Sequence, residues 1–171
     1  VFQILYRGGF YRGGPVLTSA LSGIEQALWD IKGKAANMPV YALLGGPVRD
    51  IMKVYCWVGG DRPSNVAEAA LEKHKQGYRA IKMNGTSEVA WIDTVKTVDA
   101  AVARVAEIRE KLGDDMEIAI DFHGRVHKAM ARVLMKELEP YRPMFIEEPV
   151  LTENEEAFVE LRSHTSIPIA T

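Results

Sequence analysis

Three side chains in this sequence have the types and the spacing that metal-assisted proton transfer needs. Asp121 and His123 stand two residues apart at the end of an apolar run, and Glu147 ends a later apolar run. Residues two apart on a strand point to the same face, so we expect the carboxylate and the imidazole to reach one pocket. Glu147 would join them from a later strand. This set suits a hard divalent cation beside a group that gives or takes a proton.

Other polar side chains occupy similar places. Lys82 and Asn84 end another apolar run, and Glu148 lies between Glu147 and Pro149. Lys82 would be either an ion-pair partner of the carboxylates or a cationic contact for an anionic substrate. Glu148 is expected to support the site from beside it. Carboxylates at strand ends also cap helices or pair with Arg, but ligand-type residues at one level of three strands favour a functional site.

The remaining candidates carry weaker signals. His74 and His164 lie in helical stretches and are expected to be surface or packing residues, whereas the role of His127 stays open. The single cysteine, Cys56, has no local base and is expected to be an inert buried thiol. Gly-Gly-Asp at 59–61 would let backbone approach a ligand, a weak signal shared by many turns. The three tryptophans are assigned no chemistry.

From about Met52 onward, short apolar runs alternate with longer amphipathic segments. The apolar runs predict five strands: Lys53–Val58, Tyr78–Asn84, Met116–His123, Met144–Glu147 and Ile167–Ala170. The amphipathic segments predict four helices: Pro63–Gln76, Val89–Leu112, His127–Glu139 and Asn154–Ser163.

This alternation predicts an α/β fold with a parallel sheet and right-handed crossovers, either closed as a barrel or open and doubly wound. No Gly-x-Gly-x-x-Gly follows the first strand, which weakens the dinucleotide-binding version. The first 50 residues differ, because they predict a helix over Ser19–Lys32 and a short one over Pro39–Leu44. A boundary is therefore expected near Asp50.

The charge balance argues for a small-molecule partner. The formal net charge of the 171 residues is -2, and Lys and Glu alternate along the helices, so no nucleic-acid or anionic-membrane surface is indicated. No apolar stretch reaches the roughly 18 residues of a membrane span, and no signal segment opens the chain. A cytoplasmic location is the default expectation.

Two motifs, Asp-Phe-His-Gly-Arg-Val-His at 121–127 and Phe-Ile-Glu-Glu-Pro at 145–149, resemble the enolase superfamily, and within it the sugar-acid dehydratases. The segment 18–46 and Trp-Val-Gly-Gly-Asp-Arg-Pro at 57–63 are also similar to that family. The resemblance covers nearly the whole chain. It implies a partial TIM-type (β/α) barrel over residues 51–171, preceded by the C-terminal helices of an α+β capping domain over residues 1–50.

The resemblance also implies roles for the site residues. Asp121 and Glu147 would be the first two Mg²⁺ ligands, and His123 would be the general acid that protonates the departing hydroxyl. The metal would stabilise the enediolate that forms when the α-proton of the substrate is lost. Where family members that racemise have Lys-x-Lys, this chain has Lys82 and Asn84. Asn cannot abstract a proton, which favours elimination, with both residues contacting the substrate.

The expected reaction is dehydration of a sugar acid, with galactonate as the leading substrate and mannonate or gluconate as alternatives. The family's third metal ligand and its histidine base would follow Thr171. We therefore expect a chain shortened at both ends, with two of three ligands and little or no turnover alone. A homo-oligomer is expected. The alternative from another class is a non-catalytic half-barrel that serves as an interaction or assembly module, since its sheet edges would be exposed.

Overall fold

The structure, a computed structural model, describes residues 1–59, 65–90 and 93–171. Gly60 and Asp61 of the predicted glycine loop, Pro63 at the predicted helix start, and Trp91 lie outside the described residues. The chain divides into two compact units, Val1–Met52 and Lys53–Thr171.

The first unit is helical. It contains α1 (Phe2–Arg7), α2 (Pro15–Ala35) and α3 (Val40–Leu43). Helix α2 is longer than the predicted Ser19–Lys32. It begins at Pro15, whose fixed φ suits the first helical position and whose nitrogen carries no N–H that would need an acceptor. Helix α1 was not predicted.

The second unit contains a five-stranded parallel sheet in the order β1-β2-β3-β4-β5. Its strands are β1 (Cys56–Val58), β2 (Ala80–Asn84), β3 (Glu117–Asp121), β4 (Phe145–Glu147) and β5 (Ile169–Ala170). The order follows the sequence without reversal, whereas a doubly wound sheet reverses its strand order. Of the two predicted arrangements, the structure therefore supports the barrel-like one.

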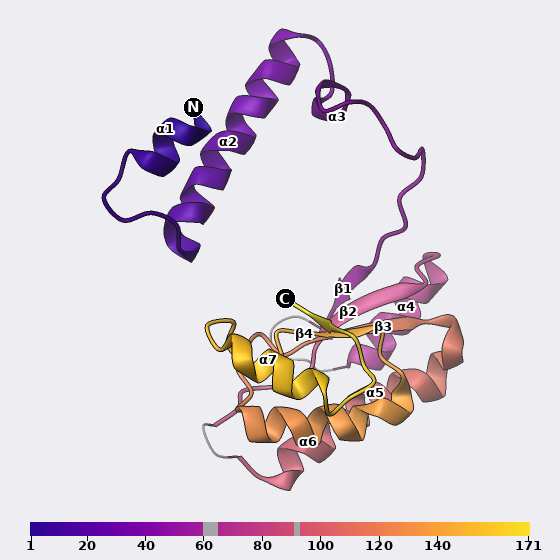
Figure 1. Cartoon of the computed structure of the whole chain (residues 1–171). Coiled ribbons are helices and arrows are strands. Elements are labelled where there is room, and N and C mark those ends of the chain that lie inside the picture. The colour runs from indigo at the N-terminus through magenta and orange to yellow at the C-terminus, as the bar shows by residue number, and fades with distance from the viewer. Residues whose placement is uncertain (60–64, 91–92) are drawn as a thin grey trace. The chain divides into compact units, whose positions relative to one another are not determined.

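Helices connect the strands and cover one face of the sheet (Figure 1). They are α4 (Val66–Lys75), α5 (Val95–Leu112), α6 (Lys128–Leu138) and α7 (Glu155–Arg162), with 3₁₀ turns η1 (Gly113–Asp115) and η2 (Glu139–Tyr141). Their buried residues recur at helical spacing, as Val98, Ala101, Val105 and Ile108 do in α5. These side chains pack against alternate strand residues, including Ile81, Met83, Ile118, Ile120 and Ile146. The other strand residues are thereby directed to the opposite face.

The sheet curls towards that opposite face. Adjacent strands lie about 4.8 Å apart, so β1 and β4 would be about 14 Å apart in a flat sheet. Yet Tyr55, directly before β1, meets Phe145 of β4 with ring centroids 6.2 Å apart. The curl is the one that a strand set needs to form part of a barrel.

Two predicted bounds were wrong for local reasons. Helix α5 begins at Val95 and not at Val89, because the Asp93 carboxylate accepts hydrogen bonds from the backbone of Ala90 and Thr94 and from the Thr97 hydroxyl. Strand β3 ends at Asp121 and not at His123, which has φ of +51°. His123 is thus in the left-handed region and no longer follows strand alternation.

Within the described ranges, no helix combines the length and the apolar character needed to cross a membrane.

Candidate active site

Three predicted site residues form one row across the sheet. Asn84 is the register partner of Asp121, and Asp121 is the register partner of Glu147. All three are the last residues of their strands, so their side chains meet at the carboxyl edge of the sheet. Asn84 is 1% exposed and Asp121 is 5% exposed. The structure therefore brings the Asn84 amide and the carboxylates of Asp121 and Glu147 to one edge of the sheet, as predicted.

Lys82 joins the two carboxylates. Its Nζ lies 2.9 Å from Asp121 Oδ2 and also pairs with Glu147 Oε2, although β2 and β4 are separated by β3. The Lys82 side chain is only 13% exposed. Burial acts to lower the pKa of this lysine, but hydrogen bonds to Glu147 and Asp121 outweigh burial, so its pKa is raised. Lys82 is therefore a charged ammonium at neutral pH.

His123 lies beside Asp121 through a turn. The His123 backbone N–H donates to Asp121 Oδ1 at 2.7 Å, and its ring Nδ1 lies 3.2 Å from the same oxygen. The prediction that both residues reach one place is met, but its reason, strand alternation, was wrong. The Asp121 side chain bonds to the backbone two residues on, a local pattern that Asp often adopts in turns.

Trp57 was missed as a site residue. Its indole meets the His123 imidazole edge to face, with centroids 6.1 Å apart and ring planes at 90°. Lys82 Nζ lies 5.8 Å from the centroid of the same indole. Strand register could have identified Trp57. Trp57 of β1 pairs with Lys82 of β2, so the two side chains lie on the same face of the sheet.

Glu148 is held by its backbone. Its N–H donates to the Ala170 carbonyl at 2.9 Å, its carbonyl accepts from Gly124 N–H at 2.8 Å, and its φ is +42°. These bonds link the ends of β3, β4 and β5. The supporting role of its carboxylate stays a prediction.

The other candidates lie apart from this group. His127 precedes α6, and its Nδ1 accepts the Ala129 N–H at 3.4 Å, so it caps that helix. His164 is exposed and His74 is half-buried in α4. Cys56 is only half-buried, whereas the sequence predicted a buried thiol, and burial raises the pKa of this thiol.

The chemistry of the donor set fits a hard cation in part. Carboxylate oxygens are the ligands that Mg²⁺ prefers, and it commonly uses one or two protein carboxylates and completes its shell with water and substrate. In the part of the chain that the structure describes, no group of three or more His, Cys, Asp or Glu side chains is placed to hold a metal. Asp121 and Glu147 therefore form a two-carboxylate set, with Lys82 between them.

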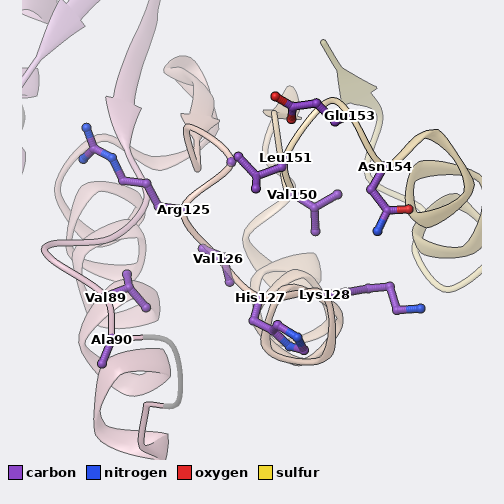
Figure 2. A pocket seen from close by; sticks show the side chains of 11 residues that line it. Val89, Ala90, Arg125, Val126, His127, Lys128, Val150, Leu151, Glu153 and Asn154 are labelled. Carbon is purple, nitrogen blue, oxygen red and sulfur yellow. The ribbon is translucent and has the colours of Figure 1, made fainter.

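A pocket of about 360 Å³ lies elsewhere, among the segments 89–90, 124–128 and 150–154 (Figure 2). Val126 and Val150 line it and also belong to the core under the helices. Lys82, Asp121 and Glu147 do not line it. The pocket is thus on the helix side of the sheet, and the chemistry-bearing group is on the other side.

Two family models match the chain. Residues 65–171 match the model described as enolase C-terminal domain-like, and residues 1–45 match the N-terminal domain of mandelate racemase / muconate lactonizing enzyme. The matched segments cover most of both units.

Curated relatives are similar over nearly the whole chain. A D-galactonate dehydratase from Ralstonia pickettii (strain 12J) is 58% identical over 170 residues, which are 99% of this chain and 44% of that relative. One from Pectobacterium atrosepticum is 58% identical over the same shares. The chain thus spans less than half the length of the curated relatives it matches.

Solved structures share the fold. A crystal structure of an enolase from Pantoea ananatis with bound D-gluconate and Mg is 32% identical, with a TM-score of 0.81 over 98% of this chain and 48% of that one. The curled parallel sheet is therefore the arrangement found in about half of such a protein.

Proposed function

Because the chain belongs to the enolase superfamily, in its mandelate racemase / muconate lactonizing enzyme group, we propose that it supplies part of a sugar-acid dehydratase active site. The reaction removes water from galactonate and gives a 2-keto-3-deoxy acid. The observation that carries the proposal is the meeting of Lys82, Asp121, Glu147 and His123 at one sheet edge. The 58% identity to a D-galactonate dehydratase supports the choice of substrate.

Asp121 and Glu147 are the proposed Mg²⁺ ligands. Both are hard oxygen donors on neighbouring strands in one row. When bound, the metal would stabilise the negative charge that develops on the substrate carboxylate as the α-proton leaves. The two side chains would help to hold the cation at the sheet edge, within reach of the substrate carboxylate.

His123 is the proposed general acid for the departing β-hydroxyl. Its Nδ1 faces Asp121, so Nε2 is the ring nitrogen directed to a substrate. The Asp121 carboxylate orients the imidazole. The side chain is 34% exposed, which leaves it accessible from the site.

Lys82 and Asn84 are the proposed contacts of the substrate. The ammonium can pair with the substrate carboxylate, and the amide can donate a hydrogen bond to it. Asn84 cannot act as a base, so the strand end that carries a second lysine in racemising relatives contributes no proton abstraction here. This supports elimination as the reaction.

Gluconate is the second candidate substrate. The Pantoea ananatis relative was solved with D-gluconate and Mg, and its structure aligns with 98% of this chain. Galactonate is favoured over gluconate because the sequence identity to the galactonate dehydratases is higher, at 58% against 32%.

The test is a chimera in which this chain replaces its matching segment in the Ralstonia pickettii relative. We expect Mg²⁺-dependent formation of a keto acid from galactonate, less from gluconate and mannonate, and little or none by the isolated chain. A folded chimera that converts none of the three acids would refute the proposed function. Preference for gluconate would move the assignment to the second candidate.

A further inference from the structure

Lys82 lies where a cation would be attracted. Its ammonium contacts one oxygen of each carboxylate, at 2.9 Å from Asp121 Oδ2 and in a direct ion pair with Glu147 Oε2. The three side chains are 13%, 7% and 29% exposed, so water screens them poorly. One positive charge therefore holds together two carboxylates that would otherwise repel each other.

A divalent cation would need the same oxygens. Mg²⁺ lies about 2.0–2.1 Å from its oxygen ligands, so a cation held by both carboxylates would be a few ångströms from an ammonium that kept its present contacts. The divalent cation and the ammonium would repel each other strongly at that separation in a partly buried site. The lysine and the metal cannot both hold these carboxylates as Lys82 does here.

The Lys82 side chain can move away from the carboxylates. Its charge sits on a flexible four-carbon stem, unlike the rigid fork of arginine. The indole of Trp57, whose centroid is 5.8 Å from Nζ, presents an aromatic surface that also attracts a cation. The ammonium can thus leave one carboxylate without being moved into an apolar environment.

We propose that the Lys82 ammonium competes with a divalent ion for the carboxylates of Asp121 and Glu147, and that the ion binds by displacing the ammonium from at least one of them. Lys82 thereby sets the metal affinity of this site, in addition to any contact with substrate. The inference rests on the proposed function only in taking Asp121 and Glu147 as the ligands.

Removal of the Lys82 ammonium is expected to change the affinity for the metal by altering both the free and the metal-bound protein. In the free protein the two carboxylates lose their counter-charge, and in the bound protein the metal loses a repelling neighbour. Both effects favour binding, and we expect an affinity for the metal about tenfold higher or more. Lys82→Arg keeps the positive charge and should keep the weak affinity of the original chain.

The experiment titrates the chain with Mn²⁺, which takes the same oxygen ligands as Mg²⁺. Free Mn²⁺ is followed by electron paramagnetic resonance at fixed pH, and Mg²⁺ is then added as competitor. The variants are Lys82→Met, Lys82→Gln and Lys82→Arg, with Lys128→Met as the matched control because Lys128 pairs with Glu160 at 2.7 Å outside the site. Circular dichroism checks that each variant folds.

We expect tighter Mn²⁺ binding for Lys82→Met or Lys82→Gln and unchanged binding for Lys82→Arg and Lys128→Met. Adding Asp121→Asn to Lys82→Met should abolish the gain. Equal affinity of the original chain and both neutral variants would overturn this inference and leave the proposed metal ligands standing. No binding by any folded variant would also overturn this inference, whereas the proposed function is tested separately by the activity of the chimera.

Discussion

The indole of Trp57 meets the imidazole of His123 edge to face, with centroids 6.1 Å apart. The same indole lies 5.8 Å from Lys82 Nζ. One aromatic side chain from β1 therefore borders both the proposed acid and the proposed cationic contact.

Replacement of Trp57 is expected to disturb the His123 ring more than it disturbs the fold. In the chimera, Trp57→Leu should lower kcat by about tenfold or more with a smaller change in KM, because small misplacements of a catalytic group are costly. Trp57→Phe, which keeps an aromatic ring, should retain most of the rate. Trp29→Leu, in the first unit, is the control. Equal kcat values for Leu and Phe at position 57 would argue against a positioning role.

His123→Asn is expected to lower kcat of the chimera by about 10²–10⁴-fold, the usual contribution of a general acid. Asn is the suitable replacement because it tolerates positive φ better than most residues, and His123 has φ of +51°. Melting temperature should therefore change little. The exposed His164→Asn serves as control. A rate close to the parent would remove His123 from the mechanism.

Arg109 is expected to stabilise the second unit by joining two segments, 113–116 and 141–142. Its guanidinium donates to the carbonyls of Tyr141, Gly113, Met116 and Arg142. Arg109→Met leaves these acceptors without their partner and should cost about 2–4 kcal/mol of unfolding free energy in urea.

Lysine at position 109 cannot reach all four carbonyls, so Arg109→Lys should recover only part of the loss. The exposed Arg132→Met should change stability by no more than about 0.5 kcal/mol. A loss at Arg109 no larger than that at Arg132 would contradict the prediction.

Glu139 predicts a pH dependence. Hydrogen bonds from the Ser166 N–H, from Lys136 and from the Thr165 hydroxyl lower the pKa of this carboxyl from 4.5 to about 2. Since the folded pKa lies below the unfolded one, its stabilisation is present above about pH 4.5 and is lost as pH falls towards 2.

Glu139→Gln should therefore melt at a lower temperature than the parent near pH 7, and the two curves should converge as pH approaches 2. Glu72→Gln, which removes an exposed ion pair with Lys75, should show little difference at any pH. A Glu139→Gln difference that is constant from pH 7 to pH 2 would contradict the assignment.

The meeting of Lys82, Asp121 and Glu147 could be predicted from sequence, because strand ends of a parallel sheet converge at one edge. The bounds of α5 and β3 could not, since single side chains decide them: Asp93 starts the helix at Val95, and Asp121 turns the chain after β3. Hydrophobic periodicity carries no information on such local hydrogen bonds.

The role of Trp57 was missed for a different reason. An aromatic residue on a short strand fits a core position as well as a site position, and only pairing with Lys82 separates the two. Helix α1 is short, and six residues give too little periodicity to identify a helix.

The row Asn84–Asp121–Glu147 also depends on the register in which the three strands pair. If β3 slipped by one residue, Asp121 would turn towards the apolar side chains under the helices and Ile120 would take its place at the site. A carboxylate forced into that layer without a counter-charge is strongly unfavourable. The residues proposed for metal binding would thus also disfavour a sheet in the wrong register. Such a sheet would be less stable and would lack the proposed metal site.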